Sequence, residues 1–198
     1  MSLSLSAPHA GHSFDLDAAQ DKKTRRRQLL AVRQAIPEDL KKQYDHVLCL
    51  QIQSWLQEKA VKSVSVFLPI RNEPNLKELY EMLSGNIQMA LPYVSTKDSP
   101  LEFIAWRPGD ELVEGAFRIP VPKAMQRIPI PDVLIIPCVG YTAGHYRLGY
   151  GGGFFDRTLE GQDNVLTLGV AYSCLKTDFR VEQFDMPLNA IITEVGLE

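Results

Sequence analysis

The residues from Arg147 to Asp156 combine a cation, four glycines and a carboxylate within ten positions. Glycine loses more conformational entropy on folding than any other residue, so such a run is expected where the backbone adopts positive φ or approaches a ligand closely. An arginine guanidinium can donate paired hydrogen bonds to a phosphate, and an aspartate is a hard oxygen ligand suited to magnesium. The stretch therefore predicts a site for a nucleoside triphosphate and its metal ion.

Glycine clusters are most often tight turns, so the prediction depends on the neighbouring elements. Residues 133–136 form an apolar run typical of a buried strand, and residues 154–159 have helical spacing. The order strand, glycine turn, helix directs backbone N–H groups toward the carboxyl edge of a sheet, where phosphates bind. The run matches neither standard nucleotide motif, because Tyr150 stands where a P-loop needs lysine and Phe154 replaces the third Rossmann glycine.

A second group of cations lies in a predicted helix that is capped by Asp21 and ends before Pro37. Its first turns, where the helix dipole disfavours positive charge, carry Lys22, Lys23, Arg25, Arg26 and Arg27. Such a charge run is usually a solvated face. Lys22 and Arg26 are four residues apart and share one face of the helix, so an anionic partner could contact both.

Helices alternate with short apolar strands along the chain, and this order predicts a three-layer α/β/α sandwich with a mostly parallel sheet. Helices are predicted at 21–36, 38–58, 76–83 and 154–159, and strands at 64–68, 87–91, 133–136, 166–172 and 190–193. Residues 101–106 and 116–119 flank a turn-rich segment and are expected to pair with each other beside the main sheet. Residues 1–20 are predicted to be a flexible tail, and residues 21–198 a single domain.

Composition limits the classes of partner and compartment. The 198 residues suit one domain, and a net charge of −3 gives no general attraction to nucleic acid or to an anionic membrane. Three cysteines without a CxxC pair indicate free thiols in a reducing compartment. No stretch approaches the roughly 20 apolar residues of a membrane span, and no secretion signal is recognisable. We therefore expect a cytoplasmic protein.

The segment from Pro137 to Tyr141 and the run Arg147-Leu148-Gly149-Tyr150-Gly151-Gly152-Gly153-Phe154-Phe155-Asp156-Arg157 closely resemble the signature of the 5-formyltetrahydrofolate cyclo-ligase family, also called methenyltetrahydrofolate synthetases. The resemblance covers roughly residues 21–194. Its other anchors are Lys22 and Arg26, Phe67-Leu68-Pro69 through Glu73, Phe103 with Trp106 and Gly109, Phe184-Asp185-Met186-Pro187, and Ile191-Ile192-Thr193-Glu194. The resemblance implies the cyclo-ligase architecture, which is CoA-transferase-like and agrees with the predicted sandwich.

The resemblance also implies residue roles. Contacts to ATP are implied for Lys22, Arg26, Arg147, Leu148, Gly149, Tyr150, Gly151, Gly152, Gly153, Phe154 and Phe155. Contacts to folate are implied for Leu68, Glu73, Tyr150, Gly151, Gly152, Gly153 and Phe154. Lys22 and Arg147 are the expected catalytic cations, and Asp156 with Asp185 the expected Mg²⁺ ligands. Glu73 alone would be an ordinary loop carboxylate, but a carboxylate suits the donor edge of a pterin.

The activity implied by the resemblance is the ATP-dependent conversion of 5-formyltetrahydrofolate to 5,10-methenyltetrahydrofolate, with release of ADP and phosphate. The formyl oxygen attacks the γ-phosphate, N10 closes the ring, and phosphate leaves. Such chemistry needs charge neutralisation and positioning more than a protein nucleophile. The expected partners are these two small molecules and Mg²⁺, with no nucleic acid and no membrane, and the expected state is a monomer.

Three positions depart from the family pattern, and two other functions stay open. Phe154-Phe155 replaces a commoner pair that contains tyrosine, Asn189 replaces a frequent aspartate, and residues 177–179 lack the usual Leu-Pro. His145 is a candidate general acid or base by its type and by its position next to the glycine turn, and Trp106 is expected in the core rather than on a ligand. The alternatives are a non-catalytic nucleotide- or folate-binding module, and a sugar-phosphate or CoA-ester enzyme on a related fold.

Overall fold

The computed structural model of the chain describes residues 11–198, with side chains from Asp21 onward. Its helices are α1 (Gly11–Gln34), α2 (Glu38–Lys59), α3 (Lys77–Leu83) and α4 (Phe154–Leu159), with 3₁₀ turns η1 (Ala116–Arg118) and η2 (Ser173–Leu175). Its strands are β1 (Ser63–Ser65), β2 (Gln88–Tyr93), β3 (Glu102–Ala105), β4 (Leu112–Glu114), β5 (Pro120–Pro122), β6 (Arg127–Ile128), β7 (Val133–Pro137), β8 (Gly140–Tyr141), β9 (Arg147–Leu148), β10 (Leu166–Val170), β11 (Ala190–Thr193) and β12 (Gly196–Leu197). Helices and strands therefore alternate as the sequence predicts.

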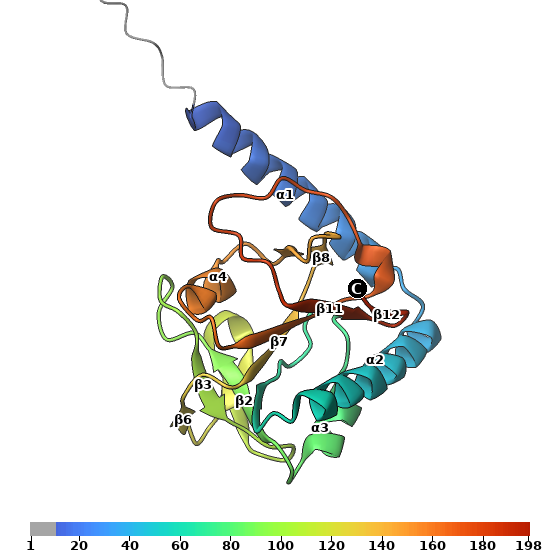
Figure 1. Cartoon of the computed structure of the whole chain (residues 1–198), viewed down its shortest axis with the longest axis vertical. Coiled ribbons are helices and arrows are strands. Elements are labelled where there is room, and N and C mark those ends of the chain that lie inside the picture. Colours follow the sequence, from blue (N-terminus) through green and yellow to red (C-terminus); the bar gives the residue numbers. More distant parts are fainter. Residues whose placement is uncertain (1–10) are drawn as a thin grey trace, which may run out of the picture.

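The main sheet has the strand order β12-β11-β10-β7-β1-β2-β3-β6 (Figure 1). The five strands from β11 to β2 run parallel, and β12, β3 and β6 join the two edges antiparallel. In the central pair, Leu166 lies opposite Val133 and Val170 opposite Pro137. The predicted mostly parallel sheet and α/β class are confirmed.

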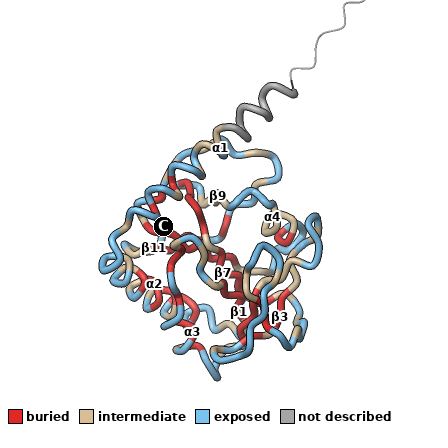
Figure 2. The backbone as a smooth tube through the Cα atoms, turned by 180° about the vertical axis from the view of Figure 1, so that it is seen from behind, coloured by how far each residue is buried: buried red, intermediate tan, exposed pale blue. Residues whose placement is uncertain are grey.

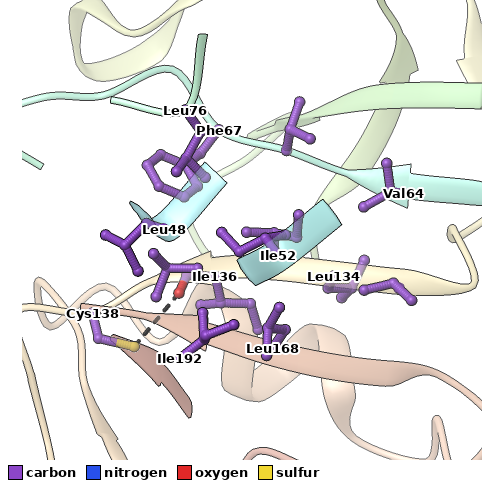
Figure 3. Packing of buried hydrophobic residues seen from close by; sticks show 14 of the residues in the cluster. Leu48, Ile52, Val64, Phe67, Leu76, Leu134, Ile136, Cys138, Leu168 and Ile192 are labelled. Atoms are coloured by element: carbon purple, nitrogen blue, oxygen red, sulfur yellow. Dashed lines mark hydrogen bonds between the residues drawn. The ribbon is translucent and has the colours of Figure 1, made fainter. Parts of the chain in front are cut away.

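Consecutive buried residues in a central strand are typical of a parallel sheet that is covered on both faces. Residues 133–136 of β7 are all buried, so both faces of this strand are covered. Leu48 and Ile52 of α2 pack on one face against Ile136 and Ile192 (Figure 3). Figure 2 shows β1 and β7 as buried backbone in the middle of the molecule. The apolar runs in the sequence thus become the core of the sheet.

Helix α1 begins at Gly11, ten residues before the expected cap at Asp21. No proline or glycine interrupts residues 12–20, and residues 18–20 are good helix formers, so the helix continues in the N-terminal direction. The predicted flexible tail overlaps this helix from Gly11 onward, and residues 1–10 lie outside the described part of the chain. Lys23, Arg25 and Arg27 are exposed, which confirms the solvated-face interpretation for these three.

The expected pairing of residues 101–106 with 116–119 is wrong. Strand β3 pairs with β2 and β6, whereas Ala116–Arg118 is a 3₁₀ turn in which Phe117 has φ of 56°. A side chain with positive φ does not continue a strand. Strands β4 and β5 form a separate hairpin around this turn, and the prolines at both ends of β5 lack the N–H donors that a central strand needs.

The cysteines are unpaired, as the sequence predicts. Cys49 and Cys138 are buried and Cys174 is exposed. Burial raises the pKa of the Cys49 thiol to about 11 and that of the Cys138 thiol to about 12, so both stay protonated near neutral pH. Among the described residues, no helix is long and apolar enough to cross a membrane.

The close approach of β10 to its neighbours predicts that Gly169→Ala destabilises the fold. A Cβ at Gly169 would lie 2.4 Å from Ile191 Cδ1, 2.7 Å from Leu188 Cδ1 and 3.1 Å from Cys138 Sγ. We expect overpacking to lower the free energy of unfolding by about 1–3 kcal/mol, measured by urea unfolding. Gly144→Ala is the matched control, because its Cβ would meet no atom closer than 3.5 Å. Equal stability of the two variants would contradict this packing.

Candidate active site

The candidate site lies at the carboxyl edge of the parallel strands. Because β1 and β7 are adjacent and parallel, the loops that follow them leave from the same edge of the sheet. The loop after β1 carries Glu73, and the chain after β7 carries the glycine turn. The two meet directly, since the Tyr150 hydroxyl donates a hydrogen bond of 2.7 Å to Glu73 Oε1.

The glycine turn has the backbone that its composition predicts. Gly151 and Gly153 have φ of 94° and 65°, values that favour glycine, and α4 begins immediately afterwards at Phe154. A Cβ at Gly151 would lie 3.3 Å from the Arg26 guanidinium carbon. The turn therefore needs glycine both for its conformation and for the close approach of α1.

Two cations of α1 reach the glycine turn and the loop that precedes β11. Lys22 is 5% exposed, and its Nζ lies 2.5 Å from Glu182 Oε2 and 2.6 Å from Asp185 Oδ2. Arg26 Nε donates a hydrogen bond of 2.7 Å to the Gly149 carbonyl oxygen. Burial lowers the pKa of the Arg26 guanidinium, and the charges of Glu182 and Asp185 counteract this shift. The predicted shared face of Lys22 and Arg26 is confirmed, and its acidic partners come from a distant segment.

Arg147 and Asp156, at the two ends of the glycine run, form an ion pair. Arg147 Nη2 lies 2.9 Å from Asp156 Oδ1, and the guanidinium stacks over the Phe155 ring with its carbon 5.7 Å from the ring centroid. The Arg147 side chain is 6% exposed and that of Asp156 is 26% exposed. Asp156 thus orients the guanidinium while part of its carboxylate stays accessible.

A third cation of α1 was missed by the sequence interpretation. Arg33 has no exposed surface, and its Nη2 donates a hydrogen bond of 2.6 Å to the Tyr150 hydroxyl. Tyr150 in turn donates to Glu73, which is 2% exposed and accepts a further hydrogen bond of 2.9 Å from the Ile70 N–H. The available signal was spacing: Arg33 follows Lys22 by eleven residues, and Leu29 lies between them on the same stripe.

Burial raises the pKa of the Glu73 carboxyl group above its ordinary value. The hydrogen bonds from Ile70 N–H and the Tyr150 hydroxyl, and the charges of Arg33 and Arg71, act in the opposite direction. Burial likewise raises the pKa of the Tyr150 phenol, which is therefore a neutral donor to Glu73. The described contacts thus supply the buried carboxylate with two donors and two cations.

The sequence of the chain is similar to a family of known enzymes. The sequence profile of the 5-formyltetrahydrofolate cyclo-ligase family matches residues 18–194. The chain belongs to this family. The "5-formyltetrahydrofolate cyclo-ligase" of Escherichia coli strain K12 is 36% identical over 140 residues, which cover 66% of this chain and 77% of the relative. That of Mycoplasma pneumoniae is 29% identical over 178 residues, which cover 88% of this chain and 99% of the relative.

Two solved structures with a similar fold support the assignment of the chain to this family. The 5,10-methenyltetrahydrofolate synthetase of Mycoplasma pneumoniae aligns with a TM-score of 0.74 at 27% identity, over 88% of this chain and 99% of that one. The NMR structure of the Aquifex aeolicus 5,10-methenyltetrahydrofolate synthetase aligns with a TM-score of 0.77 at 26% identity, over 89% and 91%. The family and the ligase class predicted from the sequence are confirmed.

The cyclo-ligase carries the two expected magnesium ligands in different surroundings. Asp156 is held by Arg147, and Asp185 Oδ2 accepts from both Lys22 and the Glu182 N–H. Within residues 21–198, no group of three or more His, Cys, Asp or Glu side chains is arranged to hold a metal ion. Magnesium commonly binds through one or two protein carboxylates together with substrate phosphates, so the partly accessible Asp156 fits this mode.

Other predicted residues of the cyclo-ligase occupy the same edge or the core. Leu68 is half-buried and packs against the core after β1, and Phe154 lies at the start of α4, where Arg157 stacks on its ring. Trp106 is buried and packs edge-on against Tyr80 with ring centroids 5.4 Å apart, so its expected core role is confirmed.

Two residues singled out in the sequence have structural contacts. Asn189 Oδ1 accepts hydrogen bonds of 2.7 and 2.9 Å from Thr167 N and Oγ1, so Asn189 links the start of β11 to β10. His145 adopts φ of 61° and its carbonyl accepts from the Leu188 N–H, so the backbone of His145 anchors the segment before β11.

A cavity of about 830 Å³ lies at the opposite edge of the sheet, near the start of β2 and the end of β3. In its lining, Lys123 Nζ lies 2.8 Å from Glu111 Oε1, and Asp110 Oδ2 accepts a hydrogen bond from the Arg107 N–H. None of the predicted ligand residues lines this cavity. The cavity is therefore separate from the glycine turn and from Glu73.

The ion pairs of Lys22 predict a stability effect for Lys22→Met. The substitution removes a buried cation and leaves Glu182 and Asp185 as adjacent carboxylates. Since the side chains of Glu182 and Asp185 are 36% and 20% exposed, we expect the free energy of unfolding to fall by about 1–3 kcal/mol in urea titrations. Arg25→Met on the exposed face of α1 is the control and should cost under about 0.5 kcal/mol. A loss of similar size in both variants would mean that the Lys22 contacts contribute nothing specific.

Proposed function

We propose that this cyclo-ligase converts 5-formyltetrahydrofolate and ATP into 5,10-methenyltetrahydrofolate, ADP and phosphate at the carboxyl edge of its sheet. The observation that carries this proposal is that the segment from Arg147 to Asp156 contacts the Arg26 guanidinium through Gly149 and the buried Glu73 through Tyr150. A triphosphate and a donor-rich heterocycle could therefore bind next to each other across the turn.

The cations support the ATP half of this proposal. Lys22, Arg26 and Arg147 all lie against the glycine turn or the loop before β11, and each is already oriented by an acceptor. Phosphoryl transfer depends mainly on positioning and charge neutralisation. We assign to Lys22 and Arg147 the neutralisation of charge on the transferred phosphoryl group, and to Arg26 and residues 148–155 the binding of the nucleotide.

Glu73 supports the folate half. A carboxylate with two oxygens can accept paired hydrogen bonds from the 2-amino group and ring N–H of a pterin. Its Tyr150 and Ile70 contacts fix its orientation before substrate arrives. We assign Glu73 as the anchor of the pterin, with Leu68, the glycine turn and the ring of Phe154 as the apolar and backbone walls.

In the proposed reaction, the formyl group of the folate and the γ-phosphate of ATP bind next to each other and react directly. The oxygen of the N5-formyl group attacks the γ-phosphorus of ATP, ADP leaves, and the formyl carbon becomes an imidate phosphate. N10 attacks that carbon and gives up its proton, which leaves with the phosphate when the carbon–oxygen bond breaks, and the 5,10-methenyl product remains. The residues of the chain hold the two substrates in line and exclude water; no protein nucleophile is required.

Magnesium supports the triphosphate by neutralising part of its charge when it is bound. Asp156 would hold it, because this carboxylate is partly exposed and borders the glycine turn. Asp185 could join through a rearrangement of its Lys22 ion pair. A cytoplasmic location, a monomeric state and the absence of nucleic-acid or membrane partners stay predictions from the sequence.

Incubation with 5-formyltetrahydrofolate and Mg-ATP tests the proposal. We expect the near-ultraviolet absorption of the conjugated methenyl product to rise with ATP and Mg²⁺, and to stay at baseline when either is omitted or EDTA is in excess. Binding of both ligands without product would indicate the non-catalytic module instead. Full activity in excess EDTA would remove the magnesium assignment.

Glu73→Gln tests the folate anchor separately. The variant keeps the size but replaces one acceptor oxygen with a donor amide facing the pterin donors. A hydrogen bond to a charged group contributes about 1.5–3 kcal/mol, so we expect folate affinity to fall about tenfold or more in isothermal titration. ATP affinity measured without folate should hold. Glu81→Gln, at an exposed position of α3, is the control for charge loss; unchanged folate affinity in Glu73→Gln would disprove the anchor role.

A further inference from the structure

The inner stripe of α1 ends at Arg33, a cation with no exposed surface. Its guanidinium donates to three acceptors on three other segments: Nε to the Arg71 carbonyl at 3.1 Å, Nη1 to the Cys138 carbonyl at 3.4 Å, and Nη2 to the Tyr150 hydroxyl at 2.6 Å. The Arg33 carbonyl also accepts a hydrogen bond of 2.9 Å from Asn72 Nδ2. Arg33 thus joins α1 to the substrate loop and to the glycine turn.

The Tyr150 hydroxyl stands between Arg33 and Glu73 with its donor and acceptor roles fixed. A guanidinium has no acceptor, so the phenol oxygen accepts from Arg33 and its proton points to Glu73 Oε1. The result is a continuous chain from guanidinium through phenol to carboxylate. Arg71 adds a second guanidinium over the Tyr150 ring, with its carbon 5.3 Å from the ring centroid.

We propose that Arg33 is a positioning residue of the folate site, which acts through Tyr150 to hold Glu73 as an oriented carboxylate. This inference rests on the proposed role of Glu73 as the pterin anchor. A buried carboxylate without a nearby cation would take up a proton. One of its two oxygens would then become a hydroxyl donor and could no longer serve as an anionic acceptor. Arg33 supplies the positive charge, and the Tyr150 hydroxyl, which is held by Arg33, fixes the position of the Glu73 carboxylate.

Among the ionisable groups that face Glu73, Arg33 is the buried cation. The ionisable groups that face Glu73 are Arg33 from α1, Arg71 from its own loop, Tyr150 from the glycine turn, Tyr80 from α3 and Cys138 after β7. Burial raises the pKa of both Tyr80 and Cys138, so these two groups are neutral near pH 7. Arg71 is an exposed residue, and solvent screens its charge.

The shape of the guanidinium is as necessary as its charge. Three donors in a planar fork reach three different acceptors, whereas a lysine ammonium on a flexible stem is a compact point charge that cannot span them. The two substitutions Arg33→Lys and Arg33→Met therefore separate geometry from charge. Arg25→Met on the exposed face of α1 is the matched control.

The test compares Arg33→Met, Arg33→Lys, Tyr150→Phe and the Arg33→Met, Tyr150→Phe double variant in steady-state kinetics. We expect Arg33→Met to raise the KM for 5-formyltetrahydrofolate about tenfold, with the KM for ATP within about twofold of wild type. The double variant should resemble Arg33→Met, because both substitutions interrupt one path. Arg25→Met should have wild-type constants.

The pH dependence of kcat/KM for folate supplies a readout that a purely structural role would not move. Loss of the Arg33 charge raises the pKa of Glu73, so the carboxylate is lost at a higher pH and the acidic limb should move up by about one pH unit or more in Arg33→Met. Arg33→Lys keeps a positive charge but not the fork, so its folate KM should rise while its acidic limb stays in place.

Wild-type folate KM and an unmoved acidic limb in Arg33→Met would overturn the inference, as would equal losses for folate and ATP. If Arg33→Met does not fold, Arg33→Lys and Tyr150→Phe decide: a rise in folate KM alone supports the inference, and unchanged constants overturn it. Failure of the proposed function is distinct, because the wild-type protein would then form no methenyl product or Glu73→Gln would keep its folate affinity.

Discussion

The contact between α1 and the carboxyl edge of the sheet is the constraint on which the rest of the site depends. Leu29 packs at this contact, where a Cβ on Gly140 would lie 2.5 Å from Leu29 Cδ1. On the same stripe, Lys22 reaches the loop before β11, and Arg26 and Arg33 both reach the glycine turn. Burying the cationic inner face of α1 is costly unless each cation meets an acceptor. The docking of α1 therefore depends on the acceptors in the glycine turn and in the loop before β11.

Each cation of the site already has an acceptor in the structure. Arg147 is paired with Asp156, and Lys22 with the carboxylates of the loop before β11. Such pairing pre-orients the side chains, which reduces the reorganisation needed when a triphosphate binds. It also sets a condition on binding, because phosphate oxygens must share or replace these partners. In the structure, carboxylates of the chain itself therefore neutralise the charges of Arg147 and Lys22.

The parallel sheet explains why Glu73 and the glycine turn lie side by side. Adjacent parallel strands β1 and β7 release their loops on the same side, so Glu73 and Tyr150, 77 residues apart in sequence, come within 2.7 Å. Antiparallel neighbours would send these loops to opposite edges. The topology thus brings Glu73 and the glycine turn together without any local sequence signal.

The sequence by itself determined the α/β class, the glycine turn with its positive φ, the family, and the shared face of Lys22 and Arg26, because all of these are written in local periodicity, composition or a contiguous motif. Only the tertiary structure decided that Arg33 is buried against Tyr150, that Lys22 pairs with Glu182 and Asp185, and that residues 116–119 form a turn beside their own hairpin. These facts depend on segments more than a hundred residues apart, or on which strand a short apolar run selects as its neighbour. Spacing along one chain carries no information about such pairings, because packing of the whole sheet fixes them.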